Sequence, residues 1–144
     1  MFSKNGVIEN CTTNFNELVG ICLINNENVT VLNSVAEHNT AGIRLEARNV
    51  TIKNNIIKNN KAGGIFVVWK SCNNKIIGNL LENNENAIRI IEYSENNVVK
   101  NNTCKNNAKD IGIRKEMVNF VEDNYCKIRY LTEDEAFRKG TKEK

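Results

Sequence analysis

The stretch that decides the fold lies between residues 49 and 79, where short runs of alternating apolar and polar residues are separated by Asn and Gly. It reads Asn49-Val50-Thr51-Ile52-Lys53-Asn54-Asn55-Ile56-Ile57-Lys58-Asn59-Asn60-Lys61-Ala62-Gly63-Gly64-Ile65-Phe66-Val67-Val68, and a second copy begins at Asn73-Asn74-Lys75-Ile76-Ile77-Gly78-Asn79. Such alternation is typical of strands with one buried face, and Asn and Gly tolerate the left-handed backbone of tight turns. The stretch predicts three short strands in each copy.

Copies of this unit recur along most of the chain at a nearly constant spacing. One series is an apolar residue three positions before a marker Asn or Ser, with steps of 24, 21, 24, 23 and 22 residues: Val7, Val31, Ile52, Ile76, Val99 and Val121. A second series is a small residue followed by Ile, with steps of 22, 22, 23 and 25 residues: Gly20-Ile21, Gly42-Ile43, Gly64-Ile65, Ala87-Ile88 and Gly112-Ile113. A shared period of this size predicts stacked coils, because a solenoid returns like residues to the same wall.

Strand alternation assigns the side chains of each coil to the inside or the outside. In the quoted stretch the inward residues are Ile52, Asn55, Ile57, Ile65 and Val67, and the outward residues are Thr51, Lys53, Ile56, Lys58 and Phe66. Asparagine is abundant, with 28 residues, and the marker positions Asn10, Asn55, Asn79, Asn102 and Asn124 recur with the same phase. Stacked Asn side chains can hydrogen-bond in ladders, so we expect ladders between coils. We interpret His38 as a substitute for a turn Asn, since other copies have Asn there.

Composition and length narrow the class of protein. The 144 residues suffice for one domain with a core, and 20 Lys+Arg against 17 Asp+Glu, well mixed along the chain, do not suggest nucleic acid. The longest apolar runs, residues 19–24 and 65–69, are far shorter than a membrane span. We therefore expect neither a nucleic-acid nor a membrane partner.

The five cysteines are odd in number and have no C-x-x-C spacing, so neither a disulfide scaffold nor a zinc site is expected. We expect no metal and no cofactor. The register places Cys104 and Cys126 in an inward stack with Ala36, Ile57 and Leu81. We expect both to be small apolar core residues; a bridge or a metal site would have to lie in the core.

The ends of the chain carry different signals. The first residues have no apolar signal region, which fits a reducing, cytoplasmic compartment, or an extracellular one if the chain is a fragment of a secreted protein. Thr132 and Glu135 form a capping-box pattern ahead of Gly140. We expect a β-helix over residues 1–127 and a capping segment with a short helix over residues 128–144. The first coil lacks such a cap and is a candidate surface for a homo-oligomer.

The phrase Asn-Asn-x-Ile-x-x-Asn-x-Ile-x-x-Asn … Gly-Ile-x-Val, seen over residues 49–67 and 73–90, resembles a repeat of the pectate-lyase-like superfamily. It is most similar to the Asn-rich repeats of NosD-type proteins and of carbohydrate-binding and sugar-hydrolase domains, and it covers about residues 5–127. The resemblance implies an all-β, right-handed parallel β-helix of about six coils that binds polysaccharide along an outer sheet. It implies no single activity, because members include lyases, hydrolases, phage spikes and non-catalytic modules.

The catalytic clusters of those relatives are not recognisable here. Inverting glycosidases need paired carboxylates, whereas this chain has only Asp110, Asp123 and Asp134, with no Gly-His-Gly motif. Lyases combine a carboxylate-bound Ca²⁺ with a base, and the carboxylate cluster is missing. We expect no catalytic residue; the alternatives are a lyase or glycoside hydrolase, or a fragment of one, and a component of an assembly or spike.

Three arginines form the candidate ligand site. Arg44, Arg89 and Arg114 each follow a Gly-Ile or Ala-Ile pair, which predicts the same outward position in three coils. Arginine makes bidentate contacts to carboxylates, which suits an acidic polysaccharide. The alternative is a ladder of surface ion pairs, because Glu46 and Glu116 lie two residues after Arg44 and Arg114.

Two aromatic residues complete the candidate site. Trp69 and Tyr93 follow the same strand in adjacent coils, and their rings offer surfaces on which sugars stack. The alternative is that they pack a loop on the outer sheet. The leading hypothesis is a non-catalytic β-helix module that binds polysaccharide or serves as a structural rod.

Overall fold

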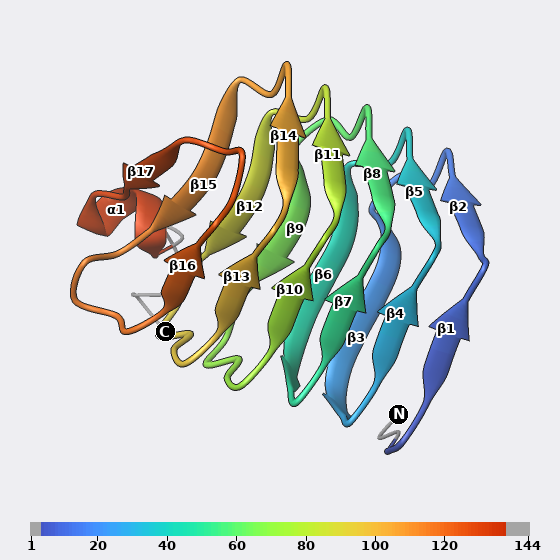
Figure 1. Cartoon of the computed structure of the whole chain (residues 1–144), viewed down its shortest axis with the longest axis horizontal. Coiled ribbons are helices and arrows are strands. Elements are labelled where there is room, and N and C mark those ends of the chain that lie inside the picture. The colour runs from blue at the N-terminus through green and yellow to red at the C-terminus, as the bar shows by residue number, and fades with distance from the viewer. Residues whose placement is uncertain (1–3, 138–144) are drawn as a thin grey trace.

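The computed structural model describes residues 4–137 and shows a parallel β-helix followed by one short helix (Figure 1). Sheet 1 contains β1 (Val7–Glu9), β4 (Thr30–Leu32), β7 (Thr51–Lys53), β10 (Lys75–Ile77), β13 (Val98–Lys100) and β16 (Phe120–Glu122). Sheet 2 contains β2 (Thr12–Asn14), β5 (Val35–Glu37), β8 (Ile56–Lys58), β11 (Leu80–Glu82) and β14 (Thr103–Lys105). Sheet 3 contains β3 (Val19–Glu27), β6 (Ala41–Arg48), β9 (Gly63–Val67), β12 (Asn86–Ile90), β15 (Lys109–Ile113) and β17 (Ile128–Tyr130). The expected parallel β-helix is confirmed.

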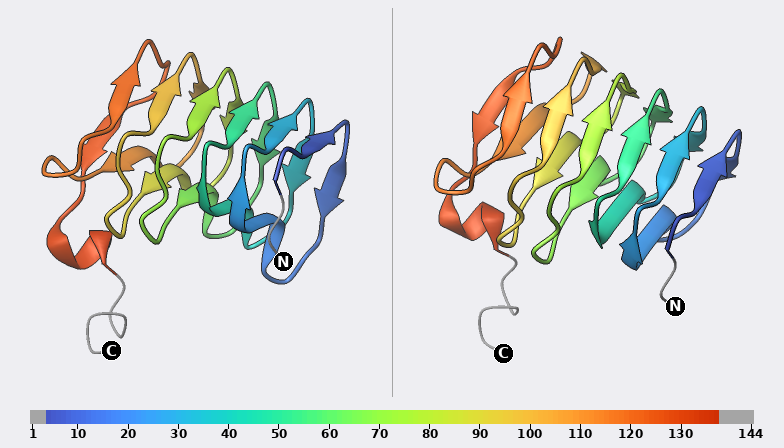
Figure 2. Two further views of the ribbon diagram at one scale, coloured as in Figure 1. Left: turned by 90° about the horizontal axis from the view of Figure 1, so that it is seen from below. Right: turned by 60° about the horizontal axis from the view of Figure 1, so that its bottom comes forward.

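Successive coils stack along one axis, as both views of Figure 2 show. Ile76 pairs with Ile52 on one side and with Val99 on the other, and all three are fully buried. The inward residues predicted for the third coil are likewise buried, and all of them except Asn55 belong to one continuous apolar core. The core is therefore a set of aliphatic columns, each filled by one residue from each coil.

Asparagine ladders run along the bends between the sheets. In the ladder between sheets 1 and 2, the Asn79 Oδ1 accepts from the backbone N–H and the Nδ2 of Asn55, at 2.9 and 3.0 Å. The Asn79 Nδ2 donates to the Ile52 carbonyl and to the Asn102 Oδ1, both at 3.0 Å. The side-chain amide of each interior Asn thus has partners for both its donor and its acceptor. It also accepts from a backbone N–H at a bend, where no neighbouring strand provides a partner. Similar ladders follow the other two bends, through Asn60 and through Asn74.

The residue before each ladder position adopts the left-handed conformation that makes the bend. Most of these residues are Asn, such as Asn54 with φ of 55° and Asn101 with φ of 56°, because Asn tolerates positive φ better than most side chains. His38 takes this role in the second coil with φ of 54°, and its imidazole stacks on Phe15. The interpretation of His38 as a turn residue is confirmed.

The first coil differs from the predicted register by one residue. Ile8, not Val7, pairs with Val31, and Val7 is 66% exposed. The ladder position falls on Cys11, whose backbone N–H donates to the Ser34 Oγ, whereas Asn10 is the left-handed turn residue. The assignment of Val7 to the apolar series was therefore wrong.

A disulfide bond joins Cys104 and Cys126, which are 22 residues apart and lie in adjacent coils of the predicted inward stack. The expectation that these sulfurs serve only as small apolar side chains was wrong. The bond follows from stacking: equivalent positions of neighbouring coils are close enough for a disulfide, and here the Cα atoms are 5.1 Å apart. Cys11, Cys22 and Cys72 are free thiols.

The chain after the last coil folds back over the outer face of sheet 3. β17 still pairs with β15, so the stacked strands extend past residue 127, and α1 (Glu133–Ala136) follows with Thr132 as N-cap and the predicted capping box to Glu135. Leu131 and Ala136 are buried against Val68 and Ile91. The helix therefore covers one side of the later coils and does not close the end of the solenoid; Gly140 lies outside the described residues. No helix among residues 4–137 has the length and apolar character to cross a membrane.

Candidate functional site

The outer face of sheet 3 carries the candidate site. Strand register defines one outward column on this face, which we call the arginine column: Cys22, Arg44, Phe66, Arg89, Gly112 and Arg129. Neighbouring coils are about 4.8 Å apart, so Arg44 and Arg89 lie about 10 Å apart, on either side of Phe66.

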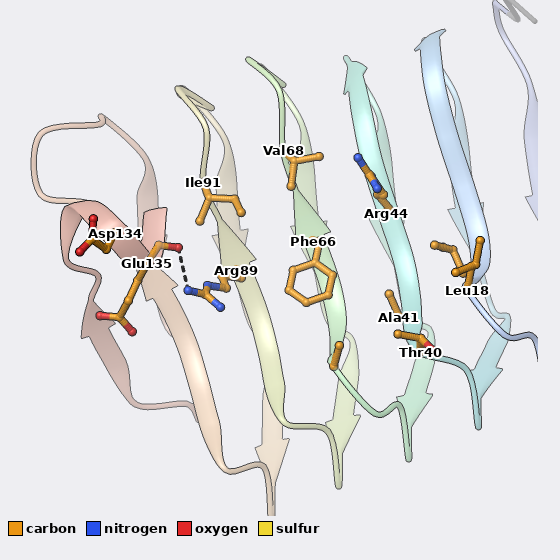
Figure 3. Close-up of a pocket in the computed structure, with 12 residues that line it drawn as sticks. Leu18, Thr40, Ala41, Arg44, Phe66, Val68, Arg89, Ile91, Asp134 and Glu135 are labelled. Atoms are coloured by element: carbon orange, nitrogen blue, oxygen red, sulfur yellow. Dashed lines mark hydrogen bonds between the residues drawn. The ribbon is translucent and has the colours of Figure 1, made fainter. Parts of the chain in front are cut away.

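A groove of about 480 Å³ runs along this face across four coils. It is lined by Leu18, Val19, Thr40, Ala41, Arg44, Ala62, Phe66, Val68, Arg89, Ile91, Asp134 and Glu135. Figure 3 shows the Phe66 ring at the centre of the groove, with the two guanidinium groups on either side and the α1 carboxylates at one end. The site is therefore an apolar groove with two basic groups along it and acidic side chains at one end.

Small residues keep the floor of the groove low. The Phe66 ring lies over Gly63, where an added Cβ would come within 2.6 Å of the ring. Ala41 and Ala62 line the adjoining part of the groove. A larger side chain at position 63 would lift the ring into the channel, because close-packed side chains cannot absorb such an overlap.

The two groove arginines have different partners. The Arg44 guanidinium forms an ion pair with Glu46, as one of the alternatives from sequence anticipated. The Arg89 Nη2 instead donates to the backbone carbonyl of Glu135 at 2.7 Å, and its buried Nε has no hydrogen-bond partner within residues 4–137. Burial lowers the pKa of Arg89, an effect that the nearby Glu135 opposes, and the guanidinium stays charged. The buried Nε of Arg44 likewise has no partner among the described residues, so the two arginines differ in the group each guanidinium binds: a carboxylate for Arg44 and a neutral carbonyl for Arg89.

Arg114 does not occupy the arginine column. Ile111, not Ile113, pairs with Ile88, and Gly112 pairs with Arg89, so Arg114 lies two residues further along the sheet. Its Nε forms an ion pair with Glu116 at 2.9 Å, and its Nη1 donates to the Leu131 carbonyl. The predicted equivalence of Arg114 with Arg44 and Arg89 was wrong, because the Gly112-Ile113 pair imitates the repeat two residues after the equivalent pair, Asp110-Ile111.

Arg129 occupies the column position that the sequence interpretation missed. It lies opposite Gly112 and binds the Glu135 carboxylate at 2.6 Å. The dipeptide Ile128-Arg129 repeats Ile43-Arg44 and Ile88-Arg89. This repetition was the signal in the sequence that could have placed Arg129 in the arginine column.

Trp69 and Tyr93 lie at the far end of the sheet 3 strands, outside the groove. Both are well exposed, at 47% and 61%, and both have positive φ. The two residues do not lie opposite each other in adjacent coils. The Lys70 N–H donates to the Glu92 carbonyl, so Tyr93 lies opposite Lys70, one residue after Trp69. The Tyr93 ring packs on Phe137 with ring centroids 4.7 Å apart, which matches the alternative that it packs a segment on the outer sheet. The structure therefore does not unite these rings with the arginines.

The acidic end of the groove is held in place by Glu135. Its carboxylate binds Arg129 and accepts from the Thr132 backbone N–H at 3.1 Å. These contacts, that with Arg129 first, lower the pKa of Glu135 to about 2. The Glu135 carboxylate therefore remains charged at any ordinary pH and keeps its contacts with Arg129 and Thr132.

Metal-ligating side chains do not gather on this face or elsewhere in the described part of the chain. No three His, Cys, Asp or Glu residues lie close enough to hold one ion. His38 is 3.9 Å from Glu37, and its ring is stacked on Phe15. The free thiols of Cys11, Cys22 and Cys72 lie in different parts of the solenoid.

Comparison with known protein families shows a match over most of the chain. The family described as "Periplasmic copper-binding protein (NosD)" matches residues 1–129, which include β1 to β16. Searches of the curated proteins and of the solved structures return no match to this chain. The family match agrees with the predicted repeat and with the observed fold.

Proposed function

This chain belongs to the NosD family, and we propose that it is a non-catalytic binding module that holds an acidic polysaccharide along the groove of sheet 3. The observation that carries the proposal is the arrangement of Arg44, Phe66 and Arg89 on three successive coils. It offers one ring between two cations about 10 Å apart. A strand of sugar acids fits this pattern, since its ring faces are apolar and its carboxylates recur at regular intervals.

The chemistry of the groove supports a sugar acid over a neutral sugar. Aromatic rings stack on the apolar faces of sugars, and arginine recognises carboxylates through paired N–H groups. Arg89 binds only a neutral backbone carbonyl, whereas Arg44 already has Glu46 as a counterion. We therefore assign Arg89 the main role in charge recognition and Phe66 the role of the stacking surface.

The description of the family names copper and the periplasm. The described residues do not fit a copper site, because His38 stands apart from the free thiols and no cluster of His, Cys, Asp and Glu forms around it. The proposal involves no metal. An extracytoplasmic location is supported by the Cys104–Cys126 disulfide, since such bonds persist in oxidising compartments.

Isothermal titration calorimetry with short oligogalacturonates, and with neutral oligosaccharides of equal length, tests the proposal. We expect binding of the acidic series, and a loss of about tenfold to a hundredfold in affinity for Arg89→Gln, the equivalent of one hydrogen-bonded charge contact. Lys53→Gln is the matched control, because it removes the same unit of charge from the exposed face of sheet 1, away from the groove, and is expected to bind like the wild type. Absence of binding to the wild-type protein would refute the proposal.

A second candidate, assembly through the end coils, is favoured by exposed apolar side chains at both ends of the solenoid. Phe15 and Leu18 at one end are each 75% exposed, and Tyr125 at the other is 83% exposed. Solenoid ends also present unpaired backbone groups that another chain can pair. Light scattering over a range of concentrations tests this candidate; a mass that stays at the monomer value would exclude it.

A further inference from the structure

We infer that residues 131–137, here called the strap, are an internal occupant of the groove that an anionic ligand displaces from Arg89. The inference deepens the proposed function and rests on it. It concerns access to the site: the strap and the ligand compete for the same guanidinium.

The strap makes the polar contacts that a bound chain would make. The Glu135 carbonyl accepts from the Arg89 Nη2 at 2.7 Å, and the Ala136 carbonyl accepts from the backbone N–H of Glu92 at 3.0 Å. Both donors belong to the fourth coil, at the end of the open groove. Two consecutive carbonyls of the strap therefore satisfy groups that face outward from sheet 3.

The strap also makes apolar contacts that continue the floor of the groove. Ala136 is fully buried with Leu131 against Val68 and Ile91, two residues that also line the open part of the groove. Leu131 lies over Gly112, where an added Cβ would come within 2.9 Å of it. The open groove and the surface under the strap are thus one continuous apolar face, and the strap covers one end of it.

The charges at the end of the groove make binding of the strap and binding of an anionic ligand to Arg89 mutually unfavourable. The strap offers Arg89 a neutral carbonyl, whereas a ligand carboxylate forms the stronger, charge-assisted hydrogen bond. Asp134 and Glu135 stand at the end of the groove and repel an anion that approaches Arg89. A carboxylate is therefore bound best when the strap has moved away.

The strap is held by few contacts, so its release is inexpensive relative to unfolding of a coil. Its helix has four residues. Beyond the capping box, the contacts that hold the strap include the two carbonyl contacts, the Arg129–Glu135 pair, the small apolar cluster and the packing of Phe137 on Tyr93. Its first residue, Leu131, is also anchored by hydrogen bonds with Ile113 and Arg114. Apparent affinity scales with the fraction of molecules in the competent state. Weakening the strap should therefore strengthen binding.

Hydrogen exchange of the Glu92 amide, measured with and without a short oligogalacturonate, tests the inference together with calorimetry on Phe137→Ala. We expect the ligand to reduce protection of the Glu92 amide, which lies in the turn after β12, while the Ile88 amide within β12 stays protected. Phe137→Ala should bind about threefold to tenfold more tightly than the wild type, the equivalent of one aromatic contact. Phe120→Ala, which removes an exposed ring on sheet 1, is the matched control and should leave affinity unchanged.

The outcomes separate the inference from the proposed function. Binding that leaves Glu92 protection unchanged, or that weakens in Phe137→Ala, would overturn the inference and leave the binding module in place. Absence of binding by the wild type and by Phe137→Ala alike would overturn both.

Discussion

Replacing Asn79 by Ala tests whether the ladders stabilise the stack of coils. The side chain is 1% exposed and takes part in four hydrogen bonds, two as donor and two as acceptor. Alanine removes all four. It leaves the Asn55 backbone N–H, one Asn55 Nδ2 hydrogen and the Ile52 carbonyl without the partner that each has in the wild type.

The expected cost follows from those three groups. A buried polar group that loses its partner costs about 1–3 kcal/mol, so their sum is at least about 3 kcal/mol, even with the lowest value for each. This is a large share of the total for a domain, which is about 5–15 kcal/mol. Asn79→Ala should therefore lower the free energy of unfolding by about 3–4 kcal/mol.

Urea unfolding followed by circular dichroism measures this change, provided that the slope of free energy against urea is unaltered. The matched control is Asn101→Gly, which removes an exposed amide from the turn beside the same ladder and keeps a residue that accepts positive φ. It should change stability by no more than about 0.5 kcal/mol. A loss below about 1 kcal/mol for Asn79→Ala, or a loss equal to that of the control, would contradict the role given to the ladder.

Three further predictions concern the last coils, the close approach of β6 to β9 at Gly42, and the strap. Reduction of the disulfide, or Cys104→Ser together with Cys126→Ser, should lower stability by about 3 kcal/mol through loop entropy, and equal urea midpoints with and without reductant would contradict this. Gly42→Ala should destabilise by about 1–3 kcal/mol, because an added Cβ would lie 2.7 Å from the Gly64 carbonyl oxygen; a melting temperature equal to that of the wild type would exclude the clash. Since the pKa of Glu135 is lowered to about 2, its contacts stabilise the strap above the ordinary pKa near 4.5 and are lost as pH falls towards 2. Glu135→Gln should remove that part of the acid dependence, and an unchanged acid profile of strap exchange would refute the assignment.

The period of the coil and the inward residues could be read from the sequence, because stacking imposes one residue type on each buried column. Ile52 and Ile76 are examples: both the alternation within a strand and the repeat between strands select them. The ladders were predictable for the same reason, since a polar side chain that repeats along a buried column must carry both a donor and an acceptor to satisfy its neighbours in the coils on either side.

The errors of register arose where the residue types of two adjacent positions coincide. Turn and ladder positions both favour Asn, so Asn10 was mistaken for a ladder residue although Cys11 holds that place. Likewise Gly112-Ile113 resembles the small-residue pair of other coils, whereas the equivalent pair is Asp110-Ile111. A one-dimensional spacing cannot distinguish these choices, because coil length itself varies.

The strap lay beyond sequence reasoning for a different reason. Its capping box was visible in Thr132 and Glu135, and that part of the prediction is confirmed. Its direction depends on contacts between residues far apart in the chain, such as Arg89 with the Glu135 carbonyl. No periodic pattern encodes a contact that occurs once, and so the covered part of the groove could not be foreseen.

The ladders give the molecule a polarity that a single coil does not have. Every backbone N–H in a ladder points towards the amide of the following coil, for example from Asn74 to Asn97, 23 residues further on. An insertion or deletion therefore preserves the alternation of donors and acceptors along a ladder only if it adds or removes a whole coil, of about 23 residues. Proteins built in this way change length in steps, and each added step lengthens the outer groove by one rung.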